Sequence, residues 1–103
     1  MDIRIYKKPI MTKFIVINGI EFEASHLFGC LEEIRQTKED DHYGDYSLRN
    51  YELSYPDEMD KLVKMGFVKN YTGSRMANLY CMKDEKGIED LMTKLYELDE
   101  KDI

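Results

Sequence analysis

The stretch Lys13-Phe-Ile-Val-Ile-Asn-Gly-Ile-Glu-Phe-Glu23 decides how the fold begins. At its centre is the pair Asn18-Gly19, which supplies the two positive φ angles that a type I′ turn requires. The sequence therefore predicts a β-hairpin over residues 13–23. In the register of a two-residue turn, one face of this hairpin is apolar and belongs to the core. That face carries Ile15, Ile17, Ile20 and Phe22.

The segments before and after this hairpin also carry apolar residues that predict regular structure. The Ile3–Ile5 segment could add a third strand, so residues 1–12 are either a basic N-terminal arm or an edge strand, and residues 13–103 form one domain. After the hairpin, Ser25 is a favourable N-cap, and apolar residues at helical spacing predict a helix over residues 25–37. Gly29 inside this helix costs up to about 1 kcal/mol relative to alanine, which indicates that another element packs closely there.

The middle of the chain has weaker patterns. Residues 38–54 are acidic and rich in tyrosine without a sustained period, which predicts a loop with at most a short helix near residues 47–52. The next residues, Ser54-Tyr-Pro-Asp57, match a capping box with proline in the first turn. They predict a short helix over residues 55–65 that ends at Gly66.

The last third predicts a second hairpin and a final helix. Phe67-Val68 opens one strand, Gly73-Ser74 marks a turn, and residues 79–82 form the returning strand. Asp84 can cap a terminal helix whose apolar residues recur along one face. These are Ile88, Leu91, Met92, Leu95 and Leu98. The fold class is therefore α+β: a hairpin, a helix, a tyrosine-rich loop, a short helix, a second hairpin and an amphipathic helix.

This element order resembles a winged helix-turn-helix domain over residues 25–98. The resemblance rests on Leu62-Val-Lys-Met-Gly-Phe-Val68, which is similar to the step at which the recognition helix of that family runs into its wing hairpin. Thr72-Gly-Ser-Arg-Met-Ala77 would then be the wing tip. The resemblance implies DNA binding, and hence transcription regulation, through the helix 55–65 and the wing.

The distribution of charge is uneven. The chain has a formal net charge of −6. Residues 21–60 carry −9, whereas residues 61–83 carry five bases and no acid. Basic side chains can neutralise phosphates, and amide or hydroxyl groups can donate hydrogen bonds to them. The candidate nucleic-acid contacts are Lys61, Lys64, Lys69, Asn70, Arg75 and Lys83.

The same helix also carries carboxylates that repel phosphate, so the wing is favoured over the helix as a DNA contact. These acids are Asp57, Glu58 and Asp60. A solvated basic hairpin without a nucleic-acid partner is the alternative interpretation of the acid-free segment.

The acidic loop supports a second function, that of a protein-interaction module or inhibitor. Its composition is similar to small acidic proteins of phages and other mobile elements, including inhibitors of host defence. Such a surface would engage a basic protein, in the extreme a nucleic-acid-binding enzyme that it inhibits by imitating nucleic acid. The candidate contacts are Asp40, Asp41, Tyr43, Asp45 and Tyr46.

No catalytic or metal-binding pattern is visible. The possible zinc ligands are His26, Cys30, His42 and Cys81, and they show no ligand-pair spacing. Neither of the glycine-rich motifs that bind phosphate occurs. We therefore expect no enzyme activity, no cofactor and no metal. We also expect reduced cysteines, no membrane association and a cytoplasmic location. The amphipathic last helix leaves a homodimer open.

Overall fold

A computed structural model describes residues 2–7, 13–39, 47–73 and 76–101 of the chain. They form an α+β fold, as predicted, with two three-stranded sheets and three α-helices. The elements in chain order are β1 Ile3–Lys7, β2 Lys13–Ile17, β3 Ile20–Glu23, α1 Ala24–Glu39, β4 Leu48–Arg49, the 3₁₀ helix η1 Asn50–Glu52, α2 Pro56–Lys64, β5 Val68–Thr72, β6 Asn78–Met82 and α3 Glu85–Lys101.

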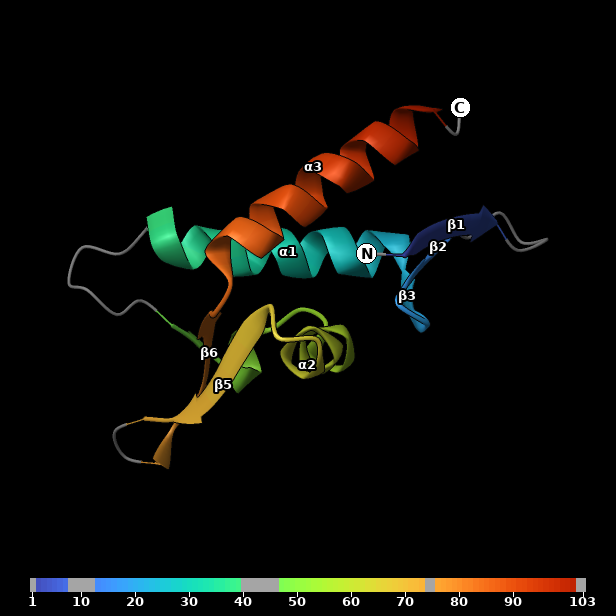
Figure 1. Ribbon diagram of the computed structural model, residues 1–103. Coiled ribbons are helices and arrows are strands. Elements are labelled where there is room, and N and C mark those ends of the chain that lie inside the picture. The colour runs from blue at the N-terminus through green and yellow to red at the C-terminus, as the bar shows by residue number, and fades with distance from the viewer. Residues whose placement is uncertain (1, 8–12, 40–46, 74–75, 102–103) are drawn as a thin grey trace.

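Helix α1 runs through the middle of the molecule (Figure 1). The first sheet lies at its N-terminal end, α3 crosses it on one side, and α2 lies with the second sheet on another. The core therefore forms around α1, where all these elements meet. Its fully buried side chains include Leu27, Leu31 and Ile34 of that helix.

The first sheet has the order β1-β2-β3 and confirms the predicted hairpin. Ile17 pairs with Ile20 across the turn, where Asn18 and Gly19 have φ angles of 50° and 83°. Strand β1 pairs antiparallel with β2 and lies at the edge of the sheet. The Ile3–Ile5 segment therefore forms an edge strand, the second of the two alternatives for the N-terminus.

Helix α1 begins at Ala24, so Ser25 lies inside its first turn. The prediction that Ser25 is the N-cap was therefore wrong; its hydroxyl instead donates to Glu23 Oε1 at 3.3 Å. The expectation of close packing at Gly29 is confirmed. A Cβ atom at this position would lie 2.8 Å from Cε2 of Tyr55, the residue that precedes α2.

Helix α2 begins at Pro56 without the predicted capping box. Tyr55 is the N-cap and makes no side-chain capping bond, and Ser54, the predicted capping residue, contacts another helix. Its hydroxyl donates to Glu33 Oε2 on α1 at 3.1 Å. Proline in the first helical position is compatible with this start, since it has no N–H group to satisfy.

The end of α2 agrees with the prediction. Gly66 has a φ of 88°, and its N–H donates to the carbonyl of Val63 at 3.1 Å. The N–H of Phe67 donates to the carbonyl of Leu62 at 3.1 Å. These two bonds are those of a Schellman motif, which also brings the buried side chains of Leu62 and Phe67 together.

The second sheet has the order β4-β6-β5. Its β5–β6 hairpin was predicted, and η1 falls within residues 47–52, where a short helix was expected. Strand β4 was not predicted. It has two residues, Leu48 and Arg49, which pair with Tyr80 and Leu79 of β6. A strand this short has too few residues to show an alternating pattern.

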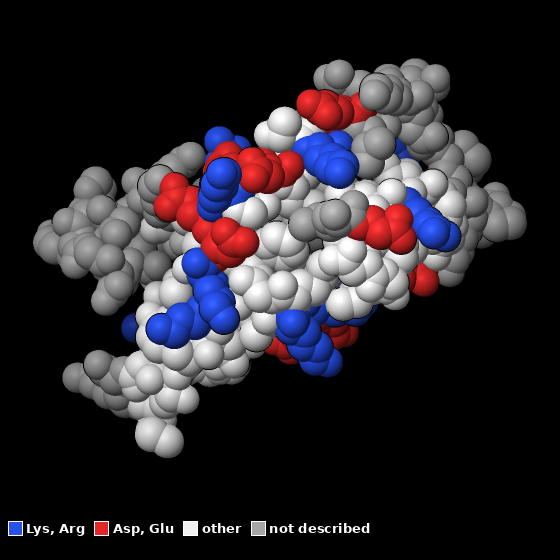
Figure 2. Space-filling model, in the orientation of Figure 1, with Lys and Arg blue, Asp and Glu red and all other residues white. Residues whose placement is uncertain are grey.

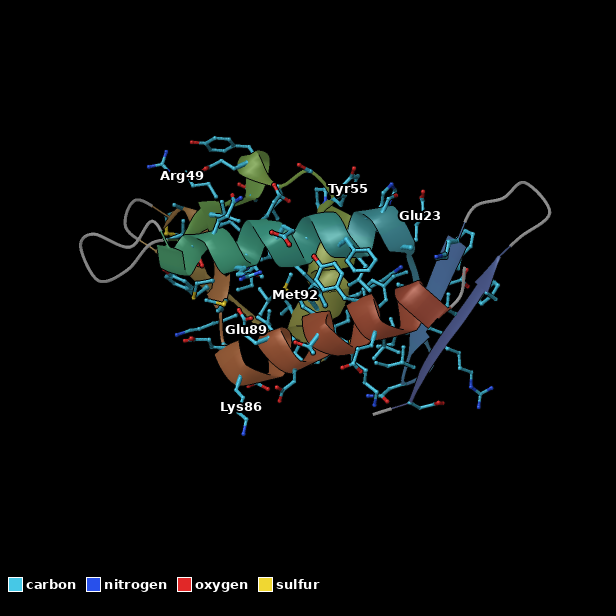
Figure 3. All side chains as sticks on the ribbon, turned by 90° about the horizontal axis from the view of Figure 1, so that it is seen from above. Glu23, Arg49, Tyr55, Lys86, Glu89 and Met92 are labelled. Atoms are coloured by element: carbon cyan, nitrogen blue, oxygen red, sulfur yellow. The ribbon has the colours of Figure 1, made fainter. Side chains whose placement is uncertain are left out.

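Helix α3 begins as predicted. The carboxylate of Asp84 accepts a hydrogen bond from the N–H of Gly87 at 2.9 Å, which is the geometry of an N-cap. The predicted apolar face is buried at Ile88, Leu91, Met92 and Leu95, whereas the side chain of Leu98 is outside the described part. An ion pair of 3.3 Å between Arg35 and Glu89 joins α1 to α3 at the surface, and Figure 3 shows Glu89 between them.

Candidate nucleic-acid interface

The acid-free segment folds into the end of α2 and the β5–β6 hairpin. Three of its lysines, Lys64, Lys69 and Lys83, have exposed side chains. None of the three forms an ion pair among the residues that the structure describes. On the face seen in Figure 2, basic side chains lie together over the β5–β6 hairpin, whereas the acids mix with bases along α3.

The base of the hairpin brings two of these lysines close together. The N–H of Lys83 donates to the carbonyl of Phe67 at 3.1 Å, so these two residues lie opposite each other. Phe67 precedes Lys69 by two residues, which makes Lys83 a diagonal neighbour of Lys69. Diagonal neighbours in an antiparallel pair are about 7–8 Å apart along the backbone. Lys69 and Lys83 therefore occupy neighbouring positions on one face of the hairpin.

The register of the second sheet places a definite set of side chains on its outer face. Arg49, Leu79 and Tyr71 form one row across the three strands, and Lys69 pairs with Cys81 in the next. The strand sequences on this face contain no aspartate or glutamate. We call the surface formed by Arg49, Lys69, Tyr71, Leu79 and Cys81 the outer sheet face.

Tyr71 is held in place across this face. Its hydroxyl lies 2.6 Å from the hydroxyl of Ser47, which precedes β4 on the far side of β6. The ammonium of Lys69 lies 5.2 Å from the centre of the Tyr71 ring, a cation–π geometry. Both the hydroxyl and the ring of Tyr71 therefore have a partner on this face.

A second pair of a cation and an aromatic ring lies at the β4 edge. Arg49 Nη1 donates to the hydroxyl of Tyr51 at 2.7 Å, and its guanidinium carbon lies 5.9 Å from the centre of that ring. The hydroxyl of Tyr51 is the main reason that the pKa of Arg49 is raised. Tyr51 is 73% exposed, and Figure 3 shows Arg49 at the periphery, on the side of α1 opposite α3.

Sequence reasoning did not assign Arg49 or Tyr51 to a nucleic-acid interface. They lie in the stretch interpreted as a loop, outside the acid-free segment. The pairing of β4 with β6 brings Arg49 to the outer sheet face, and this pairing has no local signal. The 3₁₀ helix that carries Tyr51 is fixed by a hydrogen bond from the Arg49 N–H to Glu52 Oε1 at 3.2 Å and by the buried Leu53.

Asn70, another predicted contact, lies on the opposite face of the hairpin from Lys69. Its amide nitrogen donates to Asn78 Oδ1 at 2.5 Å and to the carbonyl of Leu79 at 2.9 Å. Both amide protons therefore have partners within the hairpin. The structure gives Asn70 a place in the strand pairing rather than beside the exposed lysines.

Lys61 is likewise used inside the protein. Its ammonium donates to the carbonyl of Glu21 in β3 at 2.8 Å and lies 5.4 Å from the centre of the Phe22 ring. The neighbouring Asp60 accepts a hydrogen bond from the Tyr80 hydroxyl at 3.0 Å, and Glu58 lies 3.4 Å from His26 Nδ1. Three charged side chains of α2, those of Glu58, Asp60 and Lys61, thus contact the sheets and α1.

Several predicted residues lie outside the described part of the chain. They are Arg75 of the hairpin tip and the acidic-loop residues Asp40, Asp41, Tyr43, Asp45 and Tyr46. A protein-interaction surface on that loop therefore stays a prediction.

Cys30 and Cys81 form no disulfide bond. Cys30 is buried on α1, and its thiol donates to the carbonyl of Tyr55 at 3.4 Å. Burial, together with the nearby carboxylates of Glu33 and Glu58, raises the pKa of this thiol to about 12. A thiol with such a pKa is protonated at neutral pH and is a poor nucleophile.

His26 contacts two carboxylates, but through different ring nitrogens. Its Nε2 lies 3.2 Å from Glu23 Oε2, and its Nδ1 lies 3.4 Å from Glu58 Oε1. The ring also stacks on Tyr55, with 4.0 Å between the centroids. Over the described ranges, no three side chains of the ligand types converge on a point where a metal ion could sit.

None of the helices in the described ranges combines the length and the apolar character needed to cross a membrane. Comparisons with protein-family models, curated proteins and solved structures found no match for this chain.

Proposed function

We propose that this protein is a non-enzymatic regulatory protein that binds DNA through its β5–β6 hairpin, in the manner of the wing of a winged helix. The single observation that carries the proposal is the group of exposed lysines, on a segment without acids, that form no ion pair with any described residue. Lysines in this state keep their charge available for phosphate, whereas a lysine paired with a carboxylate would first have to break that pair.

The contacts of α2 shape this proposal. The outward face of α2 carries Asp57 and Asp60 beside Lys64, and Lys61 is bonded to Glu21. A helix with this balance of charge gains little from approaching phosphates. The proposed contacts are therefore Lys64, Lys69 and Lys83, with the hairpin rather than the helix as the main element.

The experiment is a fluorescence anisotropy titration of labelled DNA of about 20 nucleotides, at salt concentrations from about 50 to 200 mM. Three phosphate contacts predict that the logarithm of the affinity falls against the logarithm of salt with a slope of about −2 to −3. Lys69→Glu and Lys83→Glu should each weaken binding and make the slope shallower by about 1 or more.

The matched control is Lys94→Glu, which makes the same charge change at an exposed position of α3. It should leave the affinity within about twofold, because long-range charge effects are screened beyond about 10 Å at 0.1 M salt. Equal losses in all three variants would mean that only net charge matters, and no binding at low salt would reject DNA as the partner.

A further inference from the structure

We propose that the outer sheet face, together with Tyr51 at its edge, binds an unpaired nucleic-acid strand, whose bases stack on tyrosine while the flanking cations hold its phosphates. This inference rests on the proposed function and specifies the form of nucleic acid that the same surface takes.

The first observation is the alternation of cations and aromatic rings across the face. Lys69 lies over Tyr71 on β5, and Arg49 lies over Tyr51 at the β4 edge. The two pairs are connected by the row Arg49–Leu79–Tyr71 and by the bond from Tyr71 to Ser47. Stacking on aromatic rings beside positive charge is the general means by which proteins hold single strands without reading their sequence.

The second observation is that Tyr51 is exposed although the segment that carries it is fixed. Neighbouring backbone is paired with β6, and the following Leu53 is buried in the core. Its hydroxyl has a partner in Arg49, so the polar end is satisfied while the ring stays in solvent at 73% exposure. A fixed, exposed ring loses little conformational freedom on binding a planar group.

The third observation concerns width. Three strands place the two outer strand axes about 10 Å apart, before the edge side chains are added. A B-DNA major groove is about 12 Å wide and accommodates a helix or a two-stranded ribbon. The sheet is three strands wide beside Leu48 and Arg49, so a groove that took up the β5–β6 ribbon would leave the Arg49–Tyr51 pair at the β4 edge away from paired bases. An unpaired strand can lie across the outer sheet face with its bases turned toward the protein.

The experiment compares a labelled single strand with a duplex of the same length, both of about 20 nucleotides, in the anisotropy titration. The probes are oligo-dT, oligo-U and a mixed-sequence duplex. We expect each single strand to bind at least about tenfold more tightly than the duplex. Tyr51→Ala should weaken single-strand binding by about fivefold or more, since each stacked base contributes about 1–3 kcal/mol.

Further readouts separate stacking from charge. Tyr51→Ala should leave the salt slope unchanged because it removes no cation, whereas Lys69→Glu should make it shallower. Tyr51→Phe keeps the ring and should retain most of the affinity. In NMR spectra, the Tyr51 ring protons should shift upfield on adding oligo-dT. Melting temperatures of the variants should match that of the parent, because the ring is exposed.

The outcomes also separate this inference from the function on which it rests. Duplex binding as tight as single-strand binding, or an unchanged affinity of Tyr51→Ala, would overturn the inference; if Lys69→Glu still weakened binding, the proposed DNA-binding function would stand. No binding to any of the probes would overturn both and leave a protein partner as the alternative.

Discussion

The ring of Tyr55 lies directly over Gly29, so that a Cβ atom at position 29 would come within 2.8 Å of Tyr55 Cε2. This contact docks the start of α2 onto α1. The ring is also stacked on His26, and its backbone carbonyl accepts a bond from the Cys30 thiol. Since three residues of α1 hold Tyr55, the ring has little freedom to move away.

Gly29→Ala should therefore destabilise the protein, although alanine is the better helix former by about 1 kcal/mol. We expect the free energy of unfolding to fall by about 1–3 kcal/mol, the usual cost of overpacking. Urea denaturation measures it. In a Tyr55→Ala background the same change should become neutral or stabilising. A gain in stability for Gly29→Ala in the parent chain would contradict the contact.

Lys61→Ala should reduce stability without reducing DNA affinity. The change removes the bond to the Glu21 carbonyl and the cation–π contact with Phe22, which together are worth about 1 kcal/mol at a partly exposed position. Affinity should stay within about twofold. Lys64→Ala is the matched comparison. It should leave the melting temperature unchanged and make the salt slope of DNA binding shallower by about 1. The opposite pattern would assign Lys61 to the interface.

Asp84→Ala should lower the free energy of unfolding by about 1 kcal/mol, because the N–H of Gly87 loses its capping partner. Asp84→Asn should retain most of the stability, since the amide oxygen can accept the same bond. Circular dichroism during thermal unfolding measures both variants. Equal losses for alanine and asparagine would indicate that charge, rather than the capping bond, matters at this position.

Stability should fall as the pH rises above about 9. Burial raises the pKa of Cys30 from about 9 in the unfolded chain to about 12 in the folded protein, so the unfolded state loses this proton first. The stabilisation is complete below pH 9 and decreases as the pH approaches 12. The pKa of Tyr80 is also raised, first by burial and then by Asp60, which acts in the same direction.

Urea unfolding at several pH values between 8 and about 11 measures this effect. Cys30→Ala should show a shallower loss of stability with pH than the parent, whatever its stability at pH 7. At neutral pH, iodoacetamide should not modify Cys30 until the protein is unfolded. Rapid modification of Cys30 in the native protein would contradict its burial.

The parts of the fold that could be predicted are those with a signal inside a few residues of chain. Asn18-Gly19 specifies its turn through backbone conformation alone, and the Leu62–Phe67 helix end does so through Gly66. The prediction of a capping box at Ser54 was wrong because the hydroxyl of Ser54 donates to Glu33, a residue distant in sequence. It does not accept a bond from a backbone N–H at the start of α2. A capping pattern shows that a serine could cap a helix, but tertiary contacts determine which hydrogen bond its hydroxyl makes.

In the candidate site, too, some residues could be predicted from the sequence and others depend on tertiary contacts. The lysines of the hairpin stood out because an acid-free run can be counted along the chain. Composition could not show that Lys61 is bonded to Glu21, because the partner is a backbone carbonyl that any residue possesses. Nor could it show that Arg49 and Tyr71 share a row, since that depends on the pairing of β4 with β6.

Two neighbouring residues of α2 reach in opposite directions. Asp60 bonds to Tyr80 of the second sheet, and Lys61 bonds to Glu21 of the first. Helix α2, which has nine residues, thus connects the two sheets through side-chain hydrogen bonds. Asp60 and Lys61 thus hold α2 against both sheets, so a ligand that binds the hairpin would meet an element supported from behind rather than a hinged one.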